Sequence, residues 1–98
     1  MERGAYVYIL ASRRNGTLYI GLSGQLPERL FRHRTGLGSE FVWKYRVFIL
    51  VYYEWHPMYV EAIRRETALK KWRRAWKIAL IERENPEWND LTKLLLCE

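Results

Sequence analysis

The sequence predicts an α+β fold: a small three-stranded antiparallel sheet flanked by helices, in the order ββαβαα. Three observations support this. Two strand-like segments surround an Asn-Gly pair, a third apolar segment follows a short helical one, and the remainder has helical periodicity. With 98 residues, 49% hydrophobic and 29% charged, we expect one globular domain spanning residues 1–98.

The N-terminal hairpin is the clearest local signal. Residues 5–12 and 17–22 are rich in Tyr, Val, Ile and Leu, which favour strands. Asn15-Gly16 between them predicts a type I′ turn, which needs positive φ at both central residues. We therefore expect two adjacent antiparallel strands.

Alternation along these strands predicts the register, provided that the loop holds an even number of residues. The loop is then either Asn15-Gly16 alone or residues 13–16. One face collects only apolar residues: Val7, Ile9, Ala11, Leu18 and Ile20. The other, more polar face collects Tyr6, Tyr8, Leu10, Ser12, Thr17, Tyr19, Gly21 and Ser23. Along the strands, the four-residue loop would offset Tyr8 and Tyr19 by roughly 7 Å and the two-residue loop by roughly 14 Å.

A short helix and a central strand are expected next. Residues 26–35 predict a helix with Pro27 in its first turn, and "TGLG" ends it. Residues 45–54 predict an apolar strand, which His56-Pro57 terminates.

Two further helices are expected after this strand. Residues 59–84 predict a long helix and residues 86–96 a short one, divided at Asn85-Pro86. Glu66 falls within an apolar stripe of the long helix, where a carboxylate is costly unless it is paired or binds a metal. An ion pair with an arginine and a metal ligand are both open at this point. The stripe comprises Ala62, Ile63, Leu69, Trp72, Trp76 and Ala79, and its tryptophans are expected in the core.

The opposite face of the long helix is basic. Its members are Arg64, Arg65, Lys70, Lys71, Arg73, Arg74 and Lys77. Such a face is compatible with plain solvation, with tracking of a phosphate backbone, or with contact to an anionic membrane. The net charge of +6 favours nucleic acid first and a membrane surface second.

Several classes of site are excluded. Cys97 is the single cysteine, so neither a disulfide within the chain nor a cysteine-based zinc site is expected. His33 and His56 are the only histidines, which excludes a multi-histidine metal site. The sequence has no apolar run near the ~20 residues of a membrane span and no signal-peptide pattern, so we expect a cytoplasmic protein.

Arg29 and His33 lie four residues apart and share one face of the short helix. An arginine fork suits a phosphate, and histidine adds a second donor or a proton acceptor. The alternative is a basic helix without a site.

These residues together resemble the GIY-YIG nuclease family, specifically its small stand-alone bacterial members with a URI-type domain. Tyr6-Val7-Tyr8 is similar to the first motif and Tyr19-Ile20-Gly21 matches the second. Arg29, His33 and Glu66 fall where the family has its catalytic arginine, a frequent histidine and its metal-binding glutamate. By the same motif order, Asn85 is chosen as the asparagine that closes many family sites, with Asn89 as the alternative. Tyr6 replaces the glycine of the first motif, and Pro27 lies beside the arginine.

The resemblance implies hydrolysis of phosphodiester bonds. Glu66 would hold one divalent cation, Mg²⁺ or Mn²⁺, and Arg29 would contact the scissile phosphate. Tyr8 is favoured as the base that takes a proton from water, with Tyr19 assisting, and His33 would position or relay a proton. Because a free tyrosine has a pKa near ~10, such a base needs nearby positive charge.

The expected substrate is DNA, structured or single-stranded, with RNA as the alternative. The implied setting is DNA repair or recombination, without a membrane partner, and specificity is weak or comes from a protein partner. Residues proposed to contact nucleic acid are Lys44, Tyr45, Lys70, Lys71, Arg73, Arg74 and Asn85. Two other hypotheses stand beside cleavage: a non-catalytic nucleic-acid-binding module of the same fold, and a peripheral membrane protein.

Overall fold

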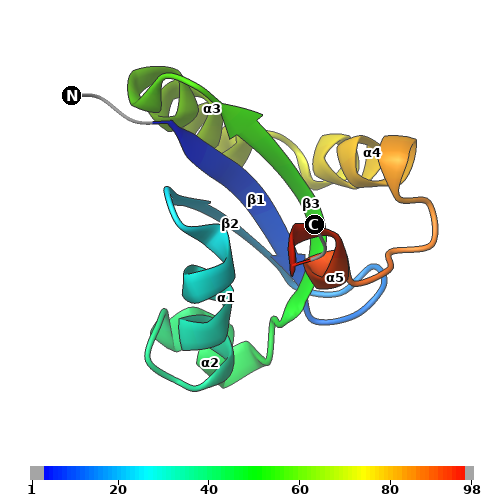
Figure 1. Ribbon diagram of the computed structural model, residues 1–98. Coiled ribbons are helices and arrows are strands. Elements are labelled where there is room, and N and C mark those ends of the chain that lie inside the picture. The colour runs from blue at the N-terminus through cyan, green and yellow to red at the C-terminus, as the bar shows by residue number, and fades with distance from the viewer. Residues whose placement is uncertain (1–3, 97–98) are drawn as a thin grey trace.

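The computed structural model describes residues 4–96, so Cys97 lies outside the described residues. It contains a three-stranded antiparallel sheet with strand order β2-β1-β3 and helices on both faces, which confirms the predicted fold class (Figure 1). The elements are β1 (Ala5–Ala11), β2 (Leu18–Ser23), α1 (Leu26–Arg34), α2 (Glu40–Tyr45), β3 (Ile49–His56), α3 (Tyr59–Lys71), α4 (Arg74–Glu84) and α5 (Thr92–Leu96).

The hairpin has the four-residue loop. Ala11 pairs with Leu18, and the Ser12 amide donates to the Thr17 carbonyl at 3.0 Å, so residues 13–16 form the connection. The type I′ turn is wrong, because Asn15 alone in this loop has positive φ, at 59°. A Cβ on Gly16 would lie 2.4 Å from the Ser12 Oγ, so close approach accounts for this glycine.

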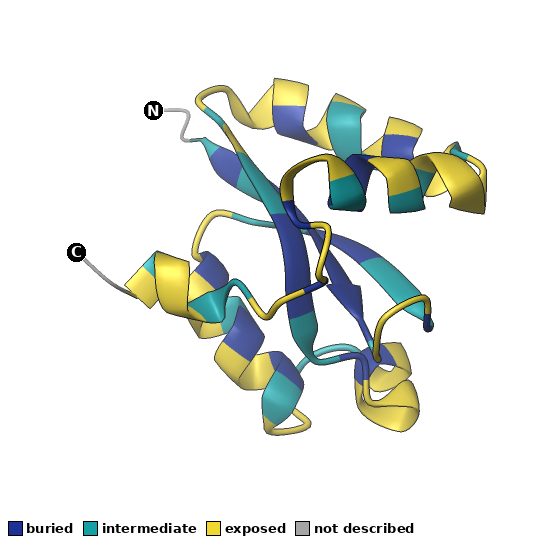
Figure 2. Cartoon of the chain, turned by 90° about the vertical axis from the view of Figure 1, so that its right-hand side faces the viewer, coloured by how far each residue is buried: buried dark blue, intermediate teal, exposed yellow. Residues whose placement is uncertain are grey.

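Both faces of the sheet are covered. α3 and α4 pack over the face that carries Val7 and Ile9, and α1, α2 and α5 cover the face that carries Tyr8 and Leu10. In Figure 2 the buried residues follow the strands and the sheet-facing sides of the helices. The face predicted to be more polar is therefore partly core: Tyr8 and Leu10 are fully buried there.

The sequence did not predict helix α2, and the predicted third strand, residues 45–54, begins four residues before the observed one. Ser39 begins the helix, since its side chain accepts a hydrogen bond from the Val42 amide. Arg46 ends it in the left-handed conformation, with φ 56°. β3 then starts at Ile49 and ends at His56, directly before Pro57.

The single helix predicted over residues 59–84 is wrong. Trp72 and Arg73 have extended backbones, with ψ of 152° and 149°, and separate α3 from α4. Arg74 then donates to the carbonyls of Asn15 and Gly16 at 2.8 and 2.6 Å, which docks α4 on the hairpin loop. After α4, the chain is irregular until α5, rather than helical from residue 86.

The break changes the apolar stripe and the basic face. Ala62 and Leu69 are buried as predicted, whereas Ile63 and Trp76 are exposed. Arg65 is not simply solvated, because its guanidinium donates to the Glu54 carboxylate of β3 at 2.9 Å.

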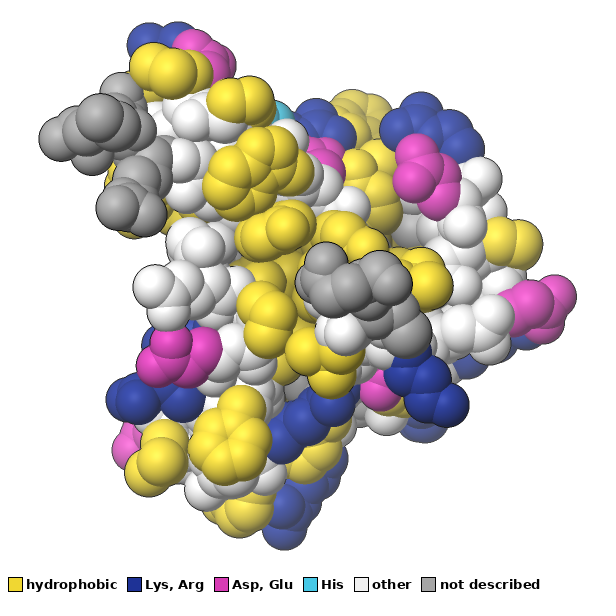
Figure 3. Space-filling view, in the orientation of Figure 1, with side chains coloured by type: hydrophobic (Ala, Val, Ile, Leu, Met, Phe, Trp, Pro, Cys, Tyr) yellow, Lys and Arg dark blue, Asp and Glu magenta, His cyan; other side chains and the backbone are white. Residues whose placement is uncertain are grey.

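The surface combines apolar and basic areas. Figure 3 shows a band of hydrophobic side chains across one face, with Lys and Arg side chains around it. Within residues 4–96, no helix is both long enough and apolar enough to cross a membrane.

Candidate active site

Two tyrosines of the hairpin lie side by side. Tyr8 is paired with Gly21 and Tyr19 with Leu10, and the centroids of the two tyrosine rings are 6.5 Å apart. A Cβ on Gly21 would lie 2.4 Å from the Tyr8 ring. Glycine at this position therefore gives the Tyr8 ring its space.

His33 of α1 contacts Tyr8 on the face of the sheet that α1 covers. Its Nε2 lies 3.0 Å from the Tyr8 hydroxyl, while the Ser39 amide donates to Nδ1 at 3.4 Å. A backbone N–H only donates, so in the neutral ring the proton is on Nε2, which donates to the Tyr8 oxygen. Burial and the charge of Arg29 lower the pKa of His33 to about 4, so the ring is neutral at pH 7.

The loop after α1 is shaped around this histidine. A Cβ on Gly38 would lie 2.6 Å from His33 Nδ1, so the chain passes the ring at a distance that only glycine allows. The "TGLG" segment therefore ends α1 and also places the Ser39 amide against His33.

Arg29 lies one turn before His33 and interacts with both tyrosines. Burial alone would lower the pKa of Arg29, but the Tyr8 and Tyr19 hydroxyls raise it above its ordinary value. The guanidinium is therefore a permanent positive charge at this site.

Tyr8 itself is not poised as an anion in this state. Burial, followed by the neighbouring Tyr19, raises the pKa of Tyr8 to about 12, although Arg29 acts in the opposite direction. Positive charge from Arg29 is present as expected, but burial exceeds its effect.

Glu66 reaches the same site from α3. Its charge is close enough to contribute to the raised pKa of Tyr8, and Lys70 is its ion-pair partner at 3.2 Å. Glu66 therefore forms an ion pair, as one of the two interpretations expected, but its partner is a lysine and not an arginine. The described residues contain no cluster of three or more His, Cys, Asp or Glu suited to a metal. A single carboxylate fits Mg²⁺, which keeps several waters and uses substrate phosphate as a ligand.

A groove of about 260 Å³ adjoins Tyr19 at the β2 edge of the sheet. Sequence reasoning missed Phe41 in its lining, because α2 was not predicted. The Phe41 ring stacks on the Tyr19 ring, with centroids 6.2 Å apart, and its centroid lies 4.8 Å from that of the Tyr45 ring. The available signal was Ser39 as a helix cap, with aromatic residues four apart behind it. The full lining is Leu18, Tyr19, Ile20, Phe41, Lys70 and Lys77.

Of the residues proposed to contact nucleic acid, three lie near this groove. Lys70 lines it, Tyr45 contacts Phe41, and the Lys44 ammonium lies 5.4 Å from the Tyr45 ring centroid. Lys71 is exposed at the end of α3.

Three others are engaged elsewhere. Arg73 lies over the Trp76 ring, Arg74 binds the hairpin loop, and Asn85 lies at the opposite sheet edge. The Asn85 amide donates to the carbonyls of Val51 and Asn89, and its oxygen accepts from the Asn89 amide. Asn85 is therefore a structural residue of the β3 edge and does not join the tyrosine cluster.

A hairpin that presents paired tyrosines, followed by an arginine–histidine helix and a helix with a central glutamate, defines a protein of the GIY-YIG class. The model of the GIY-YIG catalytic domain matches residues 4–79, and the chain belongs to this family.

Its relatives are small bacterial proteins named UPF0213. The chain is 35% identical to one from Staphylococcus haemolyticus and 34% identical to one from Streptococcus sanguinis. These alignments cover 79% and 84% of this chain and 93% of each relative. The solution NMR structure of a UPF0213 protein from Bacillus halodurans is similar, with a TM-score of 0.56 and 30% identity over 93% of this chain and 96% of that one.

Proposed function

We propose that the protein is a metal-dependent endonuclease that hydrolyses phosphodiester bonds in DNA. The observation that carries this proposal is the convergence of Arg29, Glu66 and Tyr19 around the buried Tyr8–His33 contact. Hydrolysis of a phosphodiester needs positive charge at the phosphate, a metal or base to activate water, and a site that aligns both.

Arg29 and Glu66 would act on the phosphate. Arg29 offers a planar fork that matches two phosphate oxygens and cannot lose its charge. Glu66 would hold one divalent cation, which supplies charge neutralisation on the phosphoryl oxygens. In this state the Lys70 ammonium neutralises Glu66, so a cation would compete with one lysine.

The burial of Tyr8 favours Tyr19 as the residue that takes the proton from water, in place of the Tyr8 assignment favoured from the sequence. Tyr8 is fully buried and its pKa is about 12, whereas Tyr19 is partly exposed and lines the groove. Tyr8 then supports the Tyr19 ring, and His33 holds Tyr8 by donating to its oxygen.

Conservative tyrosine substitutions distinguish these roles. Tyr19→Phe should lower the cleavage rate by about 100-fold or more, in the range of general acid–base catalysis, with little change in stability. Tyr8→Phe leaves the buried His33 donor without an acceptor and should cost about 1–3 kcal/mol of unfolding free energy. Cleavage rates and urea unfolding are the measurements. If Tyr19→Phe keeps full activity and a folded Tyr8→Phe has none, Tyr8 and not Tyr19 is the residue that takes the proton.

A cleavage screen tests the function itself. Purified protein is incubated with single-stranded, duplex, flap, branched and RNA oligonucleotides, in Mg²⁺, in Mn²⁺ and in EDTA. We expect cuts in at least one DNA substrate, with none in EDTA. Normal binding without any cleavage in either metal would refute the enzymatic proposal.

The second candidate is a non-catalytic nucleic-acid-binding module. The Glu66–Lys70 ion pair at 3.2 Å favours it, because a lysine already neutralises the carboxylate that would hold the metal. It predicts salt-dependent binding that is indifferent to divalent metal, so the same screen separates the two functions.

A further inference from the structure

A second pocket lies between α3 and α4 and shares no lining residue with the groove beside Tyr19. It has a volume of about 460 Å³ and is lined by Arg65, Trp72, Trp76, Ala79, Leu80 and Arg83. Two tryptophans and two arginines therefore form most of the wall, and the lining contains no carboxylate. Neither the relatives nor the family match assigns a role to it.

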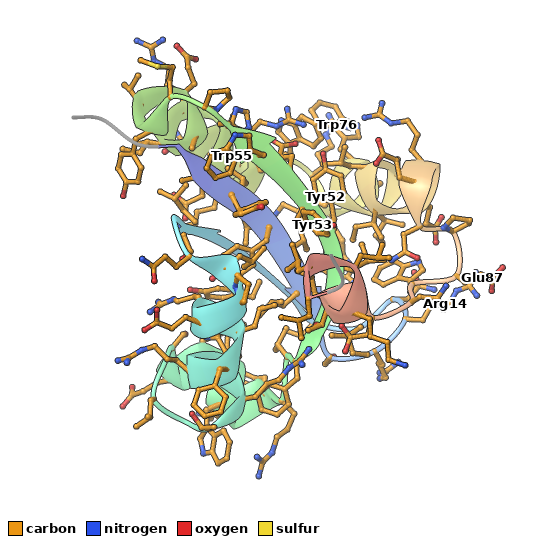
Figure 4. All side chains as sticks on the ribbon, in the orientation of Figure 1. Arg14, Tyr52, Tyr53, Trp55, Trp76 and Glu87 are labelled. Atoms are coloured by element: carbon orange, nitrogen blue, oxygen red, sulfur yellow. The ribbon has the colours of Figure 1, made fainter. Side chains whose placement is uncertain are left out.

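The tryptophans present ring surface to solvent. Trp76 is 52% exposed, and its ring contacts the Trp72 ring edge to face, with centroids 6.1 Å apart. Figure 4 shows Trp76 between α3 and α4, above Tyr52 of β3. An exposed, cationic-rimmed aromatic pair is typical of a surface that stacks planar ligands.

The charges around the pocket are positive. Arg65 is neutralised by Glu54, but Arg83 forms no ion pair with any residue among 4–96. The Arg73 guanidinium lies over the Trp76 ring, 5.3 Å from its centroid, and adds a further charge; a base that stacks on that side would displace it toward a phosphate. Stacking surface plus uncompensated arginine charge suits a ligand that is both aromatic and anionic, which describes a nucleotide.

The pocket also lies close to the proposed substrate path. Lys77 lines the groove beside Tyr19, and the preceding residue, Trp76, lines the pocket. A strand that leaves the groove therefore crosses one helix, about 10 Å in diameter, to reach the tryptophans.

We propose that the Trp72–Trp76 pocket binds an unpaired nucleobase of a single strand, with Arg73 and Arg83 at the adjoining phosphates. The proposal rests on the proposed function for its nucleic-acid substrate and assigns that substrate an unpaired segment beyond the cleaved phosphate. A base within a duplex is already stacked on both faces, so this pocket selects single-stranded over duplex DNA.

Binding in EDTA tests the pocket separately from cleavage. The probes are a labelled oligothymidylate, the same length of abasic oligonucleotide, a duplex, and vesicles containing anionic phosphatidylglycerol. Trp76→Ala should weaken binding of the oligothymidylate about 5- to 150-fold, the range of one base–aromatic stack. Binding of the abasic strand should not change. Trp76→Phe should restore most of the affinity, and Arg83→Ala should reduce the salt slope by about 0.7.

Trp55→Ala is the matched control. Trp55 is 50% exposed, lies on β3 and packs on Tyr6, outside the pocket. It should bind like the parent protein. Three results would overturn the proposal: no oligonucleotide binding by the parent, equal loss on the abasic strand, or Trp76-dependent binding to vesicles alone. If the parent protein binds the strand through Trp76 but cleaves no substrate, the proposed nuclease activity is refuted and the proposed base-binding pocket is supported.

Discussion

At the scale of single residues, the site depends on close contacts around Tyr8. Gly21 lies under its ring and His33 donates to its oxygen, so both neighbours fix where the tyrosine points. The paired tyrosines are therefore one wall of a packed cluster, and small changes beside them should alter activity and stability together.

Gly21→Ala tests this packing. Its new methyl group would meet the Tyr8 ring at 2.4 Å and should destabilise the fold by about 1–3 kcal/mol. It should also reduce cleavage, because Tyr8 and Tyr19 would shift. Gly24→Ala is the control, since its Cβ would find its nearest neighbour at 3.6 Å. Urea unfolding of both variants is the measurement, and equal stability would contradict the packing account.

His33 predicts a pH dependence of stability. Its pKa is about 4 in the folded chain and about 6.5 in an unfolded one, so the unfolded state binds the proton first. Stability from this group is complete above about pH 6.5, and roughly 3 kcal/mol is lost as the pH falls to about 4. Glu54 and Asp90 have lowered pKa values, so their contribution is lost at more acidic pH.

Urea unfolding between pH 7 and pH 4 measures this loss. His33→Gln should remove most of the decline, whereas His56→Gln should retain it. A parent protein and a His33→Gln variant with the same decline would show that His33 is not the group responsible.

At the scale of elements, the arrangement depends on contacts that a local pattern does not contain. Alternation of apolar residues predicted the strand register correctly, because each strand must place Val7 and Ile9 in the core. The break at Trp72-Arg73 was not predictable, since neither residue is a helix breaker. The docking of Arg74 on the hairpin loop, 58 residues away in sequence, accompanies this break.

Arg74→Ala tests that docking. Charged hydrogen bonds contribute about 1.5–3 kcal/mol, and partial exposure reduces this, so we expect a loss of about 1 kcal/mol. Lys71→Ala, an exposed residue at the end of α3, serves as the control. The unfolding free energy of Arg74→Ala should be lower than that of Lys71→Ala. Equal values would show that the Arg74–loop contact does not stabilise the fold.

The candidate site was predicted less completely than the fold. Tyr8, Tyr19, Arg29, His33 and Glu66 came from motif spacing, and the structure brings all five together. Phe41 was missed because a six-residue helix offers little periodicity. Asn85 was placed in the site by its position in the motif order, but its side chain completes backbone hydrogen bonds at the far sheet edge.

At the scale of the whole molecule, the helices on the two faces of the sheet each contribute residues to one site at the β2 edge. Arg29 and His33 come from one face, and Glu66 with Lys70 comes from the other, around β2. The net charge of +6 then gives the surface a general attraction for polyanions. On this account, the groove and the tryptophan pocket convert that attraction into a defined path for a strand.

The most direct test of the central claim is the single-turnover cleavage rate of Glu66→Gln in Mg²⁺, with the protein in excess over DNA. Glu61→Gln is the matched control, because Glu61 is on the same helix and pairs with Arg64 at the surface. We expect Glu66→Gln to lose at least about 100-fold in rate, with unchanged DNA affinity in EDTA, while Glu61→Gln cleaves like the parent. A Glu66→Gln variant that cleaves at the parent rate would contradict the metal-dependent nuclease at this site.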